Sequence, residues 1–153
     1  MRRLSSPELS EEVITEPITG GCLCGEVRYL CTGEPLTMGV CQCERCQRQS
    51  GSAFLIATVF NREQVNFEGR ELQVFAAGER GHQLYRHFCP TCGSAVMITL
   101  DRNPEIRSIM GGTWDNKARL RPTFSLWTSN GQPWLSLPPS IILHAGYPDG
   151  VVG

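Results

Sequence analysis

The sequence predicts an all-β protein with little helix. Short apolar runs recur between turn residues from about residue 18 onward, which is the spacing of strands in a β domain. Helical periodicity is weak by comparison, and a length of 153 residues suits one domain that buries its own core. The turns are marked by glycines, which reach backbone angles that other residues rarely adopt: Gly69, Gly78, Gly81, Gly111 and Gly112.

The strands are expected within a single domain over residues 18–153, after a flexible acidic tail over residues 1–17. Residues 27–31 place their apolar side chains at every second position, which predicts a half-buried strand. Residues 54–60 are continuously apolar and predict a strand buried on both faces, although periodicity alone leaves a helix open. Further strands are predicted at 71–77, 83–89, 94–100 and 106–111.

The remaining segments are a short helix and a long C-terminal stretch. One or two helical turns are expected at 44–49. From about residue 117 the chain is rich in proline and tryptophan, and we expect an extended segment that wraps the sheets and covers their edges.

The cysteines are the most informative residues, because seven of the eight fall into three tight clusters. An even number could indicate disulfides in a secreted protein. However, the N-terminus has no apolar run that would act as a signal peptide, and the cysteine content of about 5 per cent is below that of disulfide scaffolds. We therefore expect thiols that bind metal in a reducing cytoplasm. No apolar stretch approaches the roughly 18 residues that cross a membrane.

Two of the clusters predict a closed zinc site. Paired cysteine knuckles from distant parts of a chain, with a glycine after the last cysteine, are typical of structural zinc with four sulfur ligands. Backbone N–H groups are expected to donate to these sulfurs. We call these residues the four-cysteine set: Cys22, Cys24, Cys89 and Cys92.

The third cluster supplies three sulfurs within six residues, and we call it the cysteine triplet: Cys41, Cys43 and Cys46. Three ligands on a second zinc would leave one position for water or a substrate, as in catalytic sites. Alternatively, Glu44 or a histidine closes this site too, or the ion is weakly held. The eighth cysteine, Cys31, is expected to be a buried apolar residue. His87 could support the nearby ligand Cys89 or be a plain strand residue.

Charge is nearly balanced, with 14 basic and 15 acidic residues, which argues against nucleic acid as a partner. Lys117 is the only lysine, so the other basic residues are arginines. Most of these are expected on the solvated surface. Arg45 and Arg48 lie beside the triplet and could bind substrate carboxylates in a forked geometry. The sequence indicates no oligomeric state.

Three motifs resemble a known family: Gly-Gly-Cys-Leu-Cys-Gly-Glu-Val-Arg-Tyr (20–29), Cys-Gln-Cys-Glu-Arg-Cys-Gln-Arg-Gln-Ser-Gly-Ser-Ala-Phe (41–54) and Phe-Cys-Pro-Thr-Cys-Gly-Ser (88–94). In this order and spacing they are similar to the glutathione-dependent formaldehyde-activating enzymes and to the centromere protein V type, over roughly 19–134. The resemblance implies an Mss4-like fold of mainly antiparallel sheets with two zinc ions, held by the four-cysteine set and the triplet. Many relatives have histidine where this chain has Gln42.

The resemblance implies a carbon–sulfur lyase that acts on the adduct of glutathione, or another small thiol, with an aldehyde. The triplet zinc would bind the thiol as thiolate or polarise the aldehyde oxygen. One alternative is a non-catalytic zinc module that binds a protein partner. Another is a metal- or redox-responsive protein whose labile triplet loses zinc and oxidises.

Overall fold

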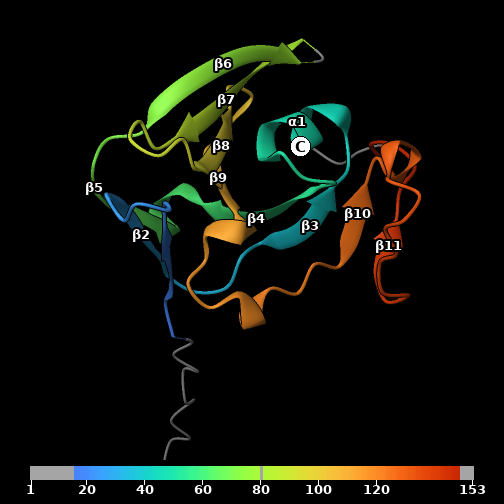
Figure 1. The fold of residues 1–153 in the computed structure, drawn as a ribbon. Helices are drawn as coiled ribbons and strands as arrows, with labels where there is room; N and C mark the ends of the chain where they lie inside the picture. The colour runs from blue at the N-terminus through green and yellow to red at the C-terminus, as the bar shows by residue number, and fades with distance from the viewer. Residues whose placement is uncertain (1–15, 80, 149–153) are drawn as a thin grey trace, which may run out of the picture.

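The computed structural model describes residues 16–79 and 81–148, and it consists of two β-sheets and one short α-helix (Figure 1). The smaller sheet has the strand order β1-β2-β5, and the larger has the order β11-β10-β3-β4-β9-β8-β7-β6. The elements are β1 (Ile18–Gly21), β2 (Val27–Cys31), β3 (Thr37–Cys41), α1 (Glu44–Ser50), β4 (Leu55–Asn61), β5 (Val65–Gly69), β6 (Gln73–Glu79), β7 (His82–Phe88), β8 (Ala95–Leu100), β9 (Asn103–Met110), β10 (Phe124–Leu126) and β11 (Ile142–Leu143). Short 3-10 turns lie between several of them: η1 (Arg62–Gln64), η2 (Gly111–Thr113), η3 (Lys117–Arg119) and η4 (Thr128–Asn130).

The predicted fold class is confirmed. Each strand expected from the sequence has a counterpart whose ends lie within about three residues of the prediction, namely β2, β4, β6, β7, β8 and β9, and the expected helix at 44–49 is α1. Strands β1, β3, β5, β10 and β11 were not predicted. Of the predicted tail, residues 1–15 lie outside the described residues.

In the small sheet, the burial of the β2 side chains follows the alternation seen in the sequence. Val27, Tyr29 and Cys31 on β2 are buried, whereas Arg28 and Leu30 between them are exposed. Successive side chains of a strand point to opposite faces, so one face of β2 is the core face. β2 pairs antiparallel with β1 on one side and β5 on the other.

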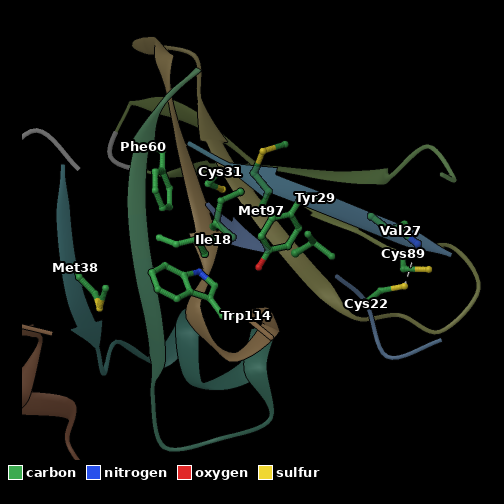
Figure 2. Packing of buried hydrophobic residues seen from close by; sticks show 12 residues of the cluster. Ile18, Cys22, Val27, Tyr29, Cys31, Met38, Phe60, Cys89, Met97 and Trp114 are labelled. Atoms are coloured by element: carbon green, nitrogen blue, oxygen red, sulfur yellow. Dashed lines mark hydrogen bonds between the residues drawn. The ribbon is translucent and has the colours of Figure 1, made fainter. Parts of the chain in front are cut away.

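The main core lies between the two sheets (Figure 2). Ile18 and Tyr29 from the small sheet pack with Phe60 and Met97 from the large sheet, and Trp114 joins them after β9. Burying each such side chain contributes about 1.5–3 kcal/mol. The ring centroids of Phe60 and Trp114 are 6.3 Å apart. This core fixes the small sheet, and with it the N-terminal cysteine knuckle, against β8.

Helix α1 is held by its surroundings rather than by its own propensity, because seven residues are too few for an isolated helix. Cys43 is its N-cap, and Gly51 ends it with a left-handed φ of 61°. The one buried residue of the helix, Cys46, packs against Leu55 and Met110 of the large sheet. In Figure 1 the strands β6 to β9 curve around α1, so the helix lies on the concave face.

The C-terminal segment extends the large sheet at the edge opposite β6. β10 pairs parallel with β3, and β11 pairs parallel with β10. The C-terminal segment therefore covers the edge of the sheet, as expected, and it does so by adding two strands. Within residues 16–79 and 81–148, no helix combines the length and apolar character needed to cross a membrane.

Candidate metal centre

The structure brings the sulfurs of the four-cysteine set together, with all four Sγ atoms within 4.8 Å of one another. Cys22 and Cys24 lie in the turn between β1 and β2, and Cys89 and Cys92 lie in the turn between β7 and β8. The Sγ atoms of Cys22 and Cys24 are 3.5 Å apart, and those of Cys24 and Cys89 are 3.8 Å apart. The core between the sheets therefore places two distant knuckles as one ligand group.

Backbone groups support these sulfurs, as expected from the sequence. The Val27 N–H donates to the Cys22 sulfur at 3.3 Å. The second knuckle is closed by Gly93, whose N–H donates to the Cys89 carbonyl at 2.9 Å and whose φ of 73° excludes most other residues. The Ser94 hydroxyl lies 3.2 Å from the Cys92 sulfur, and this contact lowers the pKa of Cys92 to about 5. A lowered pKa favours the thiolate, which is the form that binds metal.

The cysteine triplet forms a second ligand group, with its three sulfurs also within 4.8 Å of one another. Cys41 is the last residue of β3, Cys43 caps α1, and Cys46 lies in the first turn of the helix. The Cys46 N–H donates to the Cys43 sulfur at 3.3 Å. The change from strand to helix within six residues thus brings the three thiols close together.

Within the triplet, the pKa is lowered at Cys43 and raised at the other two cysteines. Hydrogen bonds from the Cys41 and Cys46 thiols lower the pKa of Cys43 to about 2. The contact with Cys43 raises the pKa of Cys41 to about 11, and contacts with Cys41 and then Cys43 raise the pKa of Cys46. A divalent cation would stabilise all three thiolates together, so the donor set fits zinc, which favours sulfur ligands.

No histidine, aspartate or glutamate of the described residues joins the triplet within that distance. Glu44 is turned to its helix neighbour Arg48, whose Nη2 is 2.7 Å from the Glu44 carboxylate. His87 lies on β7, where its Nε2 is 2.8 Å from the Thr99 hydroxyl. Glu44, which the sequence offered by number as a fourth ligand, is thus bonded to Arg48 instead. His87 also lies outside the four-cysteine set, and Cys31 is fully buried in the core.

Gln42 connects the triplet to the C-terminal segment. Its side chain is 5 % exposed and donates through Nε2 to the Ser125 hydroxyl of β10 at 2.9 Å. The Gln47 side-chain amide donates through Nε2 to the backbone carbonyl of Gln42 at 2.7 Å and to that of Asn130 at 2.9 Å. Gln132 in turn donates to the Gln47 side chain. These contacts position the triplet, and sequence reasoning missed them because nothing in the pattern pairs residues 42 and 125.

The two arginines selected from the sequence stand on the exposed side of α1. Arg45 donates through Nη1 to the Gly78 carbonyl of β6 at 3.1 Å, and Arg48 pairs with Glu44. A third arginine, Arg86 of β7, shares a hollow with them and was missed. We expected most arginines on the surface, but Arg86 is only 7 % exposed.

Residues 17–130 match the family model described as glutathione-dependent formaldehyde-activating enzyme. The chain belongs to this family. The resemblance found in the motifs is therefore confirmed across most of the chain, and a mainly β fold with cysteine clusters able to hold metal ions agrees with the Mss4-like fold of the family.

A solved structure gives the same fold for this family member. The crystal structure of a Rhodobacter sphaeroides protein, a structural genomics target, aligns with a TM-score of 0.52 and 23 % sequence identity. The alignment covers 64 % of this chain and 88 % of that one. At this identity the likeness concerns the fold alone. No curated protein matches the chain.

Proposed function

We propose that this member of the formaldehyde-activating family is a zinc-dependent carbon–sulfur lyase. Its substrate would be the adduct of an aldehyde with glutathione or another small thiol, such as S-(hydroxymethyl)glutathione. The observation that carries the proposal is the three-sulfur triplet at the start of α1, which no histidine or carboxylate of the described residues joins as a fourth ligand. Three protein ligands are the usual number at catalytic zinc.

In this proposal the two ligand groups have different roles. The four-cysteine set holds a structural zinc between the small sheet and β8. The triplet holds the second ion, which, when bound, supplies a site where a thiol exists as thiolate near neutral pH. The chain's residues hold that site in place: Gln42 anchors it to β10, and Leu55 and Met110 pack against Cys46.

The reaction is an addition without oxidation or reduction. In the synthetic direction a bond forms between the thiol sulfur and the aldehyde carbon, and the carbonyl π electrons move to oxygen. The thiol proton ends on that oxygen, which gives a hydroxymethyl thioether. The lyase direction reverses each step. Ala57, Ala95 and Ile98 pack against the cluster of Cys46, Leu55 and Met110, so the triplet borders an apolar region, where electrostatic contacts are stronger than in water.

Exchange NMR on zinc-loaded protein with glutathione and formaldehyde tests this function. We expect faster exchange between free glutathione and its hydroxymethyl adduct than without protein. Cys43→Ser should bring the rate to the uncatalysed background, whereas Cys31→Ala, which removes a thiol outside both ligand groups, should retain it. No acceleration with several thiols and aldehydes would refute the lyase and favour a zinc module that binds a protein partner.

A further inference from the structure

Arg86 is an arginine that the protein largely covers but that borders a hollow. It lies within β7 and is 7 % exposed. In the described part of the chain, 16–79 and 81–148, its guanidinium has neither a hydrogen bond nor an ion pair. Its guanidinium nitrogens are not among the fully enclosed, unpartnered side-chain atoms of the described residues, so they keep some contact with solvent. The guanidinium therefore faces the hollow as a weakly hydrated charge that no protein acceptor of the described residues neutralises, and it is available to an incoming anion.

The strand register directs Arg86 toward the triplet face of the large sheet. Arg86 pairs with Phe75 of β6 and with Ile98 of β8. Directly opposite residues in antiparallel strands share a face. Ile98 packs against the cluster that contains Cys46. The charge and the triplet thus lie on the same side of the sheet, with Ile98 between them.

The space beside Arg86 is a hollow of about 470 Å³ between α1 and the strands β6 and β7. Arg45, Arg48 and Gln49 form its helix wall, at positions i, i+3 and i+4 that share one helix face. Phe75 adds an apolar wall. Among the residues whose side chains the structure describes, no aspartate or glutamate lines this hollow. We call it the arginine pocket.

The three arginines differ in how much charge they can offer. Arg48 is paired with Glu44, and its side chain is 78 % exposed, so water and the carboxylate screen it. Arg45 is exposed at the rim and donates to the Gly78 carbonyl. Arg86 at the wall of the pocket is only 7 % exposed, so it keeps little contact with water. An anion that enters would therefore gain most from Arg86.

We propose that Arg86 anchors a carboxylate of the thiol substrate in the arginine pocket, with Arg45 and Arg48 at its rim. A guanidinium binds a carboxylate through two parallel N–H donors, which fixes orientation as well as charge. The acid end of the substrate is then held beside α1 while its sulfur reaches the triplet. The pocket selects acidic thiols over neutral or cationic ones. This inference rests on the proposed function, since it assigns the substrate class of the same site.

Calorimetric titration with S-methylglutathione tests the pocket without a free thiol. The comparison ligand is its dimethyl ester, which has no carboxylates. Zinc-loaded protein should bind the acid at least about tenfold more tightly than the ester, because a hydrogen bond to a charged group contributes that much. In Arg86→Met this preference should disappear. Arg62→Met, which removes an arginine of η1 outside the pocket, should keep it.

Equal binding of acid and ester by the unaltered protein, or an unchanged preference in Arg86→Met, would overturn the inference. If Arg86→Met does not fold, Arg86→Lys is the second variant, because it keeps the positive charge but lacks the two parallel N–H donors. Its preference for the acid over the ester should lie between those of the unaltered protein and of a variant without the charge. A preference equal to that of the unaltered protein would overturn the inference. The adduct assay separates the two proposals. Arg86-dependent binding without acceleration refutes the lyase alone, whereas equal acceleration with acid and ester thiols refutes the pocket alone.

Discussion

Replacing Gln42 tests whether the triplet depends on the C-terminal segment. Gln42 Nε2 donates to the Ser125 hydroxyl at 2.9 Å, and Ser125 is fully buried. Gln42→Met keeps the length of the side chain but leaves that hydroxyl without its partner. A buried polar group that loses its hydrogen bond costs about 1–3 kcal/mol. We therefore expect Gln42→Met to lower the free energy of unfolding by that amount.

The double variant gives the sharper measurement. Ser125→Ala removes the orphaned hydroxyl, so Gln42→Met with Ser125→Ala should cost less than the sum of the single changes, by about 1 kcal/mol. Urea unfolding of zinc-loaded protein measures the free energies, and a chromogenic chelator measures zinc release, which should be faster from the single variant. Gln83→Met, at an exposed glutamine of β7, is the control and should stay within about 0.5 kcal/mol. A single variant as stable as the control, or additive costs, would refute the reasoning.

Three further predictions concern the ligand groups and the small sheet. Cys43→Ser should halve the zinc content measured by atomic absorption, because the triplet loses a ligand while the four-cysteine set is intact; unchanged content would contradict the separate sites. Gly93→Ala should destabilise the protein by about 1–2 kcal/mol in thermal unfolding, because its φ is 73°, whereas Gly112→Ala, which meets no atom within 4 Å, should not. The Arg28 guanidinium, and then the Thr19 hydroxyl, hold the pKa of Asp115 below its ordinary value. The stability from this contact is present above the unfolded carboxyl pKa of about 3.9 and is lost as pH falls through the lower folded value. Asp115→Asn should therefore flatten the pH dependence of stability below about pH 4, and it should cost less than about 1 kcal/mol at neutral pH because the carboxylate is 44 % exposed. An unaltered acid profile would show that another carboxylate is responsible.

The parts of the fold that were predictable are those whose signal is local. Strand β2 shows its two-residue alternation in the sequence, and the knuckles show their ligand spacing. Strand β1 has no such signal, since it ends in Gly20 and Gly21. It is a strand because it pairs with β2, and Gly20 is required there because a Cβ would lie 2.2 Å from the Tyr29 hydroxyl. That requirement is visible only once the sheet exists.

The candidate site also has a part that the sequence predicted and a part that it did not. The cysteine spacing identified both ligand groups, because knuckle ligands are close in sequence. Arg86 and Ser125 could not be found, since their importance comes from register and from parallel pairing of β10 with β3. An arginine within a predicted strand is read as solvent-facing unless its neighbours across the sheet are known.

The wide separation of the two knuckles has a consequence for biosynthesis. Cys24 and Cys89 are 65 positions apart, so a ribosome exposes the first pair of thiols long before their partners emerge. The N-terminal hairpin also waits for Trp114 to complete the apolar interior. The four-cysteine set is therefore incomplete until the second knuckle has been synthesised, and the hairpin lacks part of its apolar contacts until Trp114 follows.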